Sequence, residues 1–373
     1  MSAPVNDVVP RVSRFRLRRP RPLHQFLAGA TAGDAISTQA LIFRRWLRDM
    51  GHPSNLYAQH IHDSVQHDVQ PLSAYRRARR EEHAIYHHSI GSEVPPFLQQ
   101  HGPRLILVHH NVTPAHFFTH VDPAWAQRAR LGAEQLRLLQ PNVDLALADS
   151  AFNELELHEA GYENTGVLPI VLDAAQYDLP DNPTLAAKLN AGAGPTLLFI
   201  GRLAPNKRQE DLLKLLYCYR RFRTSARLVL VGDRWDMGYD GWVERLAAEL
   251  RLEDALTLTG KVSQQDMVTY FRHADLYVSM SEHEGFGKPL VESMLLDLPV
   301  LAYAAASVPY TLGAAGVKFH EKDFERLAEL VDILVQDHDL RARLLDVQRQ
   351  KVRQFLEPYV RRQFVACLES IAL

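Results

Sequence analysis

Two glutamates surround a glycine-containing turn in the segment SEHEGFGKPLVES, residues 281–293. Glu284 and Glu292 lie eight positions apart. The glycines let a ligand approach the backbone closely, and the proline suits the first turn of a helix, where an amide hydrogen is not needed. A helix that begins near Lys288 places Glu292 about one turn inside it. Because an acid is favourable near any helix start, an ordinary acidic first turn is the simplest alternative to a ligand site.

Two cations follow an apolar run earlier in the chain. The run TLLFIG predicts a strand, and the loop after it carries Arg202 and Lys207 ahead of a predicted helix. Cations beside a helix N-terminus favour an anion, because the unpaired amides and the helix dipole attract the same charge. A phosphate is the natural ligand, and a carboxylate that accepts two ribose hydroxyls would complement it. The loop lacks the glycines of the GxxxxGK[ST] motif, and an ordinary solvated loop is an equal alternative.

These residues follow strands in a chain that alternates short apolar runs with amphipathic stretches. From about residue 23, strands are predicted at LHQFLAG, NLYAQ, HAIYHHS, RLILVHHN, DLALADS and NTGVLPIVLD. Residues 174–195 contain three prolines and two glycines and predict a linker. The alternation then restarts, and the last part of the chain is helical. We therefore expect an α/β fold with two Rossmann-like, doubly wound domains that face each other across a cleft.

The expected organisation has four parts. A basic arm, 1–22, precedes a first domain, 23–175, and a second domain, 190–350. The final helix, 351–373, is expected to pack back onto the first domain. In open parallel sheets, ligands bind at the carboxyl ends of the strands, so the polar residues that follow the strands are the candidates for chemistry.

Composition and charge narrow the partners. A formal net charge of −2 offers no global field for nucleic acid, and the two cysteines have no zinc-type spacing. No apolar run approaches the roughly 20 residues of a membrane helix, and the N-terminus lacks the apolar core of a signal peptide. We expect a cytoplasmic protein. The N-terminal arginines could contact anionic lipid at the inner face of the cytoplasmic membrane, or form a solvated tail; they are Arg11, Arg14, Arg16, Arg18, Arg19 and Arg21.

The ordered motifs between residues 196 and 303 resemble the donor-binding half of retaining glycosyltransferases of family 4, which have the GT-B fold. The likeness is carried by FIGRLAPNKRQEDLL, LVLVGD, LTLTGKVSQQD and YVSMSEHEGFGKPLVES. A single glutamate pair would be weak evidence, whereas four motifs in the same order and spacing are specific. The resemblance implies a GT-B fold with a helical C-terminal tail.

The resemblance also implies roles for single residues. Glu292 would bind the ribose of a sugar nucleotide, and Glu284 would lie near the transferred sugar. Arg202 and Lys207 would hold the diphosphate, and the backbone near Val262 would face the nucleobase. Amides that would meet sugar hydroxyls and the diphosphate belong to Gly285, Phe286 and Gly287.

The first half resembles the same family less specifically and would bind the acceptor. In the loop GATAGDAIS, Gly33 would offer an amide to the diphosphate, while Asp34 would contact the acceptor or cap the next helix. Two predicted strands end in histidine pairs. By resemblance His110 lies near the sugar, with His109 as the competing assignment. This half looks most like bacterial transferases of lipopolysaccharide and exopolysaccharide synthesis, several of them mannosyltransferases.

The implied activity is a retaining transfer of a hexose, with mannose from GDP-mannose as the first choice. The acceptor would be a saccharide or a polyprenyl-diphosphate-linked oligosaccharide. Cations and amides at the phosphate would stabilise the departing diphosphate, so neither a metal nor another cofactor is expected. The triplet Asp337-His338-Asp339 falls in the helical tail and indicates solvated acids rather than a manganese site. The predicted catalytic set is His110, Glu284, Arg202 and Lys207.

Two alternatives keep the same fold. One is a transferase that uses a UDP-sugar, and the other is a catalytically silent subunit that binds a sugar nucleotide. The four charged residues of the second half argue against a silent subunit. A Rossmann oxidoreductase is a more distant possibility, because no GxGxxG follows a predicted strand.

Overall fold

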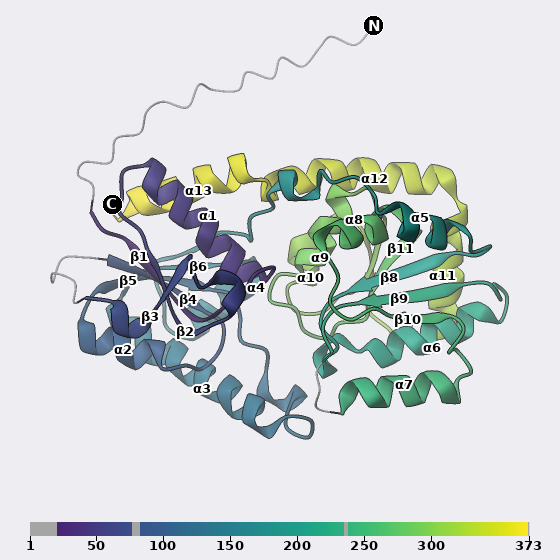
Figure 1. Ribbon diagram of the computed structural model, residues 1–373, viewed down its shortest axis with the longest axis horizontal. Helices are drawn as coiled ribbons and strands as arrows, with labels where there is room; N and C mark the ends of the chain where they lie inside the picture. Colours follow the sequence, from purple (N-terminus) through teal and green to yellow (C-terminus); the bar gives the residue numbers. More distant parts are fainter. Residues whose placement is uncertain (1–20, 77–82, 235–237, 372) are drawn as a thin grey trace, which may run out of the picture.

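The computed structural model describes residues 21–76, 83–234, 238–371 and 373, so most of the predicted basic arm lies outside the described residues. The chain forms two parallel sheets that lie side by side, each with helices on both faces (Figure 1). The first sheet has seven strands in the order β3-β2-β1-β4-β5-β6-β7, and the second has six in the order β10-β9-β8-β11-β12-β13. The doubly wound α/β prediction is thereby confirmed.

The strands are short, and those in the middle of each sheet are largely buried. The first sheet comprises β1 (His24–Ala30), β2 (Leu56–Ile61), β3 (Val69–Pro71), β4 (His83–His88), β5 (Arg104–His109), β6 (Val143–Ala148) and β7 (Thr165–Val167). The second comprises β8 (Thr196–Ile200), β9 (Arg227–Val231), β10 (Leu256–Leu258), β11 (Leu276–Ser279), β12 (Val300–Tyr303) and β13 (Val317–Phe319). Every recorded pairing between these strands is parallel. The carboxyl ends of each sheet therefore share one edge, where the candidate residues gather.

Helices connect the strands. Those of the first half are α1 (Ala35–Asp49), α2 (Val94–His101), α3 (Pro123–Leu139) and α4 (Ala151–Glu159). The second half has α5 (Pro183–Asn190), α6 (Gln209–Arg220), α7 (Tyr239–Glu249), α8 (Gln264–His273), α9 (Lys288–Leu295) and α10 (Val308–Leu312). The tail comprises α11 (Phe324–Gln336), α12 (His338–Val352) and α13 (Glu357–Ser370).

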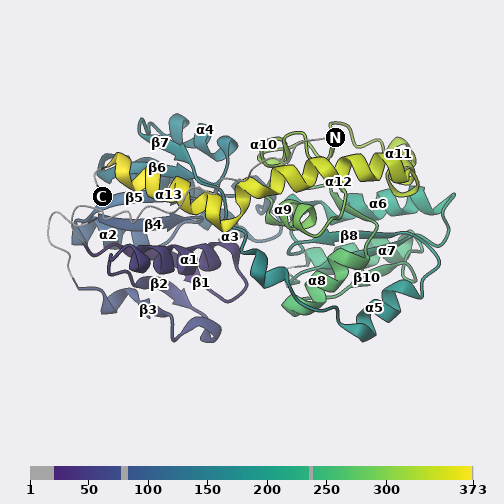
Figure 2. The same cartoon turned by 90° about the horizontal axis from the view of Figure 1, so that it is seen from above.

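The chain returns to the first domain at its end. Helices α12 and α13 run across both sheets when the molecule is seen from above (Figure 2). On α13, the ring of Phe364 stacks on Phe43 of α1 with centroids 4.4 Å apart, and both side chains are fully buried. Trp46 of α1 donates its indole N–H to Glu357 Oε1 at 2.8 Å. The last helix therefore completes the apolar core of the first domain.

Three features differ from the sequence-based expectation. The segment 174–195, predicted as a linker, contains helix α5, which Asn182 caps by accepting from two backbone amides. The strand predicted over 164–173 ends at Val167, and only Leu172 pairs again, in an isolated bridge to Leu356. Strands β3 and β13, of three residues each, were not predicted.

None of the described helices combines the length and the apolar character needed to cross a membrane.

Candidate functional site

The loop after β8 carries the two predicted cations in a fixed conformation. Arg208, which directly follows Lys207, has a left-handed backbone with φ of 54°. This conformation is unfavourable for a residue with a side chain, so the surroundings must hold it. Arg202 is exposed at the other end of the loop, and its carbonyl accepts from Gln209 Nε2 at 3.0 Å. The path of the loop is therefore set from both ends.

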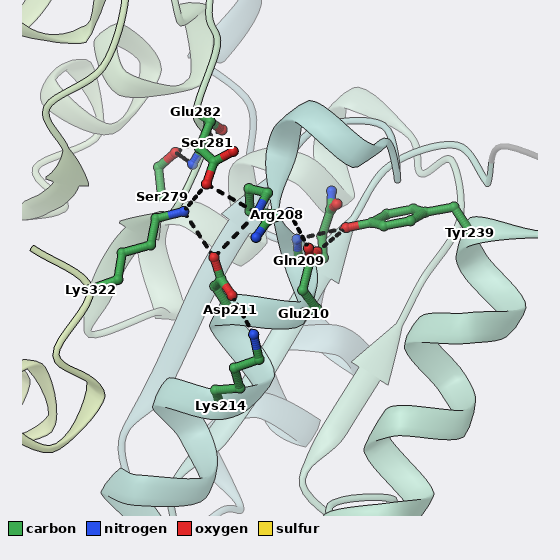
Figure 3. A network of polar contacts seen from close by, with 10 residues as sticks. All are labelled: Arg208, Gln209, Glu210, Asp211, Lys214, Tyr239, Ser279, Ser281, Glu282 and Lys322. Atoms are coloured by element: carbon green, nitrogen blue, oxygen red, sulfur yellow. Dashed lines mark hydrogen bonds and ion pairs between the residues drawn. The ribbon is translucent and has the colours of Figure 1, made fainter. Parts of the chain in front are cut away.

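A network of charges anchors this loop to helix α6 (Figure 3). The guanidinium of Arg208 lies 3.0 Å from Glu210 Oε1, 3.4 Å from Asp211 Oδ2 and 3.2 Å from Glu282 Oε1. Lys322 reaches the same Asp211 and Glu282 oxygens at 2.8 and 2.9 Å. Neighbouring ammonium groups lower the pKa of Asp211 even though its burial acts to raise it. The network joins the two loops that follow β8 and β11.

A buried tyrosine completes the network. Tyr239 of α7 donates its hydroxyl to Glu210 and accepts from the amide of Gln209 at 3.0 Å (Figure 3). Burial is the main cause of the raised pKa of this hydroxyl, and the charge of Glu210 acts in the same direction. The hydroxyl therefore stays protonated and keeps donating to the carboxylate. The start of α6 is held without any contribution from Lys207.

The two strand-end loops meet at an ion pair. The Lys207 ammonium lies 2.5 Å from Glu284 Oε2, with about a fifth and a seventh of the two side chains exposed, respectively. Asn206 holds the loops together as well, since its side-chain amide donates to the carbonyl of His283 and its own carbonyl accepts from Glu282 N. Two residues predicted to act on the diphosphate and the sugar are thus in direct contact. If the pair separates, the Lys207 ammonium can bind an anion in place of Glu284.

Helix α9 begins where the sequence predicts, at Lys288. Gly287 precedes it with φ of 81°, and a Cβ there would lie 2.7 Å from Leu290. Glu292, one turn into the helix, is only 3% exposed. Its Oε1 lies 2.9 Å from the Lys288 ammonium and accepts from the Tyr177 hydroxyl at 2.5 Å. A carboxylate buried in this way is partnered on one oxygen before any ligand arrives.

Gly285 lies at the junction of the two domains. A Cβ on this residue would lie 2.7 Å from the carbonyl oxygen of His110 and 2.8 Å from Asn111 Cβ. The carbonyl of Gly285 accepts from Asn153 Nδ2 at 2.9 Å and from Ser150 Oγ at 3.3 Å, both at the start of α4. Glycine is therefore required here by close approach of the first domain, in addition to any ligand.

The predicted cleft histidine belongs to a buried relay. Gln25 Nε2 donates to the Ala40 carbonyl at 3.0 Å, so its Oε1 must accept from His87 Nε2, 2.9 Å away. Burial lowers the pKa of His87 well below its usual value, with His110 adding to the effect. A neutral His87 then accepts at Nδ1, and His110 Nε2 donates to it at 2.9 Å. His110 Nδ1 lies 2.8 Å from Asp149 Oδ2.

A second relay starts from the next residue of each pair. His88 Nε2 lies 3.1 Å from the Gly132 carbonyl, and its Nδ1 lies 3.1 Å from His109 Nδ1. His109 Nε2 ends the relay 3.1 Å from Glu156 Oε2, which also accepts from Asn111. All four histidines are buried and use both ring nitrogens inside the first domain. The predicted sugar contact of His110 stays a prediction. The backbone of His110 lies against Gly285.

His283 is a further histidine at this junction. It is 6% exposed, and its Nδ1 is buried with no hydrogen-bond partner among the described residues. Its ring lies 6.1 Å from that of Phe117 and 6.3 Å from that of Phe152, both in the first domain. Burial lowers the pKa of His283 to about 4, although Glu156 and Glu284 oppose the shift. The imidazole is therefore neutral near pH 7.

The remaining predicted residues lie at loops of both domains. Gly33 has φ of 84° before α1, and Asp34 caps that helix by accepting from the amide of Ser37 at 2.8 Å. The alternative that Asp34 is a helix cap is thus seen directly. Val262 lies between β10 and α8, partly buried against the core of the second domain. Asp337 of the acidic triplet caps α12. Among the described residues, no group of three or more His, Cys, Asp and Glu side chains is arranged to hold a metal.

Residues 181–351 match the family model for glycosyl transferases group 1. The part of the chain from α5 to α12 is therefore similar to the group 1 glycosyltransferases. The structure is similar to that of Anabaena Alr3699/HepE in complex with UDP and glucose, with a TM-score of 0.74 and 17% identity over 94% of this chain and 100% of that one. This likeness shows the GT-B fold.

Two curated relatives are mannosyltransferases. The chain is 33% identical over 110 residues to a GDP-mannose:cellobiosyl-diphosphopolyprenol alpha-mannosyltransferase of Xanthomonas campestris, covering 29% of each chain. It is 25% identical over 256 residues to O-antigen chain mannosyltransferase B of Escherichia coli, covering 65% of this chain and 66% of that one. The match therefore spans less than a third of the first of these relatives.

Within the matched segment, the structure brings together Lys207 and Glu284, and a hydrogen bond from Tyr177 separately partners Glu292. Sequence reasoning missed Tyr177, which lies in the segment predicted as a linker, and Arg208, whose left-handed backbone is not indicated by its residue type. It also missed His283, although this residue stands directly before Glu284 in the motif. A histidine between two acids was the available signal.

Proposed function

We propose that the protein is a retaining glycosyltransferase that moves a hexose from a nucleotide sugar to a saccharide or polyprenyl-diphosphate-linked acceptor. Mannose from GDP-mannose is the first choice of donor. The observation that carries the proposal is the meeting of Lys207 and Glu284 at the start of α9, next to exposed Arg202 and the glycines of the same turn. The mannosyltransferase relatives support the choice of sugar.

The proposed chemistry needs little from the protein beyond fixed charge. When the bond between the anomeric carbon and the diphosphate breaks, negative charge develops on the phosphate oxygen. Lys207 would exchange Glu284 for the phosphate and, with Arg202 and the amides before α9, stabilise this charge, and we propose that no metal is required. The acceptor oxygen forms the new bond on the same face of the sugar, and its proton passes to the departing phosphate oxygen.

A UDP-sugar is the second candidate donor, favoured by one observation. Alr3699/HepE, whose fold matches over nearly the whole chain, was crystallised with UDP and glucose. We propose that the loop near Val262 faces the base of either donor. Binding measurements with both classes of sugar nucleotide decide between the two donors.

Our proposal includes the place of the reaction. A polyprenyl-linked acceptor is anchored in lipid, so the protein would work at the inner face of the cytoplasmic membrane in surface polysaccharide synthesis. The role of the N-terminal arm in such a contact falls on residues outside the described part of the chain, apart from Arg21.

The experiment is a panel of GDP- and UDP-sugars tested for thermal stabilisation of the full chain. A donor present at 100 times its dissociation constant adds about 2.7 kcal/mol to the free energy of unfolding. We expect GDP-mannose to give the largest shift, and Glu292→Ala to lose most of it. If neither class of nucleotide sugar stabilises the protein, the proposal is wrong.

A further inference from the structure

The ribose acid that we propose, Glu292, is already held by two groups. Tyr177 donates to Oε1 at 2.5 Å, and the Lys288 ammonium lies 2.9 Å from the same oxygen. The ammonium also lies 5.8 Å from the centre of the Tyr177 ring, so the three side chains form one closed cluster. Tyr177 and Glu292 are 3% exposed. The carboxylate has little freedom to turn.

The two oxygens of this carboxylate are not equivalent. Both recorded donors converge on Oε1, and no hydrogen bond to Oε2 occurs within the described part of the chain. Burial raises the pKa of Tyr177, and the charge of Glu292 raises it further, so the hydroxyl keeps its proton and can only donate to the carboxylate. An ionised carboxylate accepts at both oxygens. Oε2 is thus the oxygen left for a ligand.

Tyr177 comes from the segment that joins the two domains. It ends the 3-10 helix Ala174–Tyr177, just after Leu172, whose amide donates to the Phe355 carbonyl at 2.8 Å. Arg272 of α8 donates to the carbonyl of Tyr177 at 3.2 Å. The backbone on either side of the tyrosine is therefore tied down. A hydroxyl on such a backbone can define the position of its partner closely.

We propose that Tyr177 and Lys288 are positioning residues that fix Glu292 by Oε1, so that Oε2 faces the 2′- and 3′-hydroxyls of the donor's ribose. This inference rests on the proposed function, in which Glu292 binds that ribose. It predicts that removal of the Tyr177 hydroxyl or of the Lys288 ammonium lowers the preference for a ribose diol. Binding of the diphosphate should stay unchanged. Loss of general stability would weaken binding of all nucleotides alike, so the preference is the decisive quantity.

The test compares the dissociation constants of GDP and 2′,3′-dideoxy-GDP, and of the matching uridine pair, by titration calorimetry on the full chain. In the wild type we expect the ribonucleotide to bind at least tenfold more tightly, because each hydroxyl bonds to an ionised group. Tyr177→Phe, which removes one oxygen atom, should lower this ratio roughly fivefold or more. Lys288→Met should also lower this ratio. Because the Lys288 side chain is partly exposed, this second variant keeps the test valid if Tyr177→Phe misfolds.

Tyr239→Phe is the matched control. Tyr239 is also buried and also donates to a glutamate, Glu210, which lies at the start of α6 rather than in α9. Its loss should leave the ratio of the two dissociation constants unchanged, even if both rise. Glu292→Gln should remove most of the ratio, and adding Tyr177→Phe to it should have no further effect.

The outcomes separate the two proposals. If Tyr177→Phe and Lys288→Met keep the wild-type ratio while Glu292→Gln removes it, the inference is wrong and the proposed function stands. If the wild type binds both nucleotides equally, Glu292 does not bind the ribose and the inference is wrong as well. If the wild type binds no nucleoside diphosphate at all, the proposed function fails with it.

Discussion

The carboxyl edges of the two sheets both carry paired polar side chains but use them in opposite ways. In the second domain, Lys207 and Glu284 form a pair across two loops, and both side chains keep some exposure. In the first domain, His110 and Asp149 form a pair whose side chains are at most 3% exposed and whose histidine is bonded at both ring nitrogens. The first kind of pair can exchange a partner for a ligand, whereas the second kind cannot without breaking a buried chain of hydrogen bonds.

This difference assigns different tasks to the two edges. The charged pair in the second domain is suited to contact a substrate anion, since its loop is fixed by the network around Arg208 rather than by the pair itself. The relays of the first domain are suited to hold the backbone of His110 and Asn111 against Gly285. A histidine at a strand end is thus no guide to catalysis until its partners are known.

The largest predicted effect comes from the exchangeable pair. Lys207→Gln should lower kcat/KM roughly 100-fold or more, because it removes a positive charge from the proposed site of the leaving diphosphate. The measurement is the initial rate of GDP release from GDP-mannose with acceptor. Lys188→Gln, at an exposed lysine of α5, is the control and should keep the wild-type rate. A Lys207→Gln rate within threefold of the wild type would remove the distinction between the edges.

A smaller effect is expected in acid. The pKa of His283 is about 4 in the folded chain, where burial lowers it, and about 6.5 in the unfolded chain. Between these values the unfolded state binds the extra proton, so the free energy of unfolding falls as the pH drops. Between pH 7 and pH 5, His283 alone should lower the free energy of unfolding by about 2 kcal/mol. The buried His87 and His88, whose pKa values are also lowered, act in the same direction.

Urea unfolding at pH 7 and at pH 5 measures this effect. His283→Asn should reduce the loss of stability at pH 5 relative to the wild type, because asparagine takes up no proton. His320→Asn, at an exposed histidine, should leave the loss unchanged. Equal pH dependence in the wild type and in His283→Asn would mean that the ring is not buried in solution as the structure has it.

Much of the architecture could be predicted from the sequence, because buried parallel strands leave a strong signal. The runs at β8 and β11 are buried at every position and mostly apolar, as is usual for strands covered on both faces, and the paired Lys207 and Glu284 lie in the loops just after them. The start of α9 at Lys288 followed from its glycine and proline. Strands β3 and β13, of three residues each at sheet edges, gave no such pattern.

The pairing of the site residues could not be predicted in the same way. Lys207 and Glu284 are 77 positions apart, and Tyr177 and Glu292 are 115 apart. Tyr177 stands among prolines and small residues, where a linker is the simplest interpretation. Which ring nitrogen of His110 donates depends on Gln25 through His87. No local pattern connects a strand glutamine with a histidine 62 positions further on. Such contacts follow from the order of the strands in the sheet.

The most direct test of the account is the stereochemistry of transfer. Full-length protein would be incubated with GDP-mannose and a short-chain polyprenyl-diphosphate cellobioside, with UDP-glucose as the second donor, and the anomeric configuration of the new linkage read by NMR. The account predicts an α-linked product from these α-configured donors, formed by the wild type and lost in Lys207→Gln. A β-linked product, or no transfer from either donor, would contradict it.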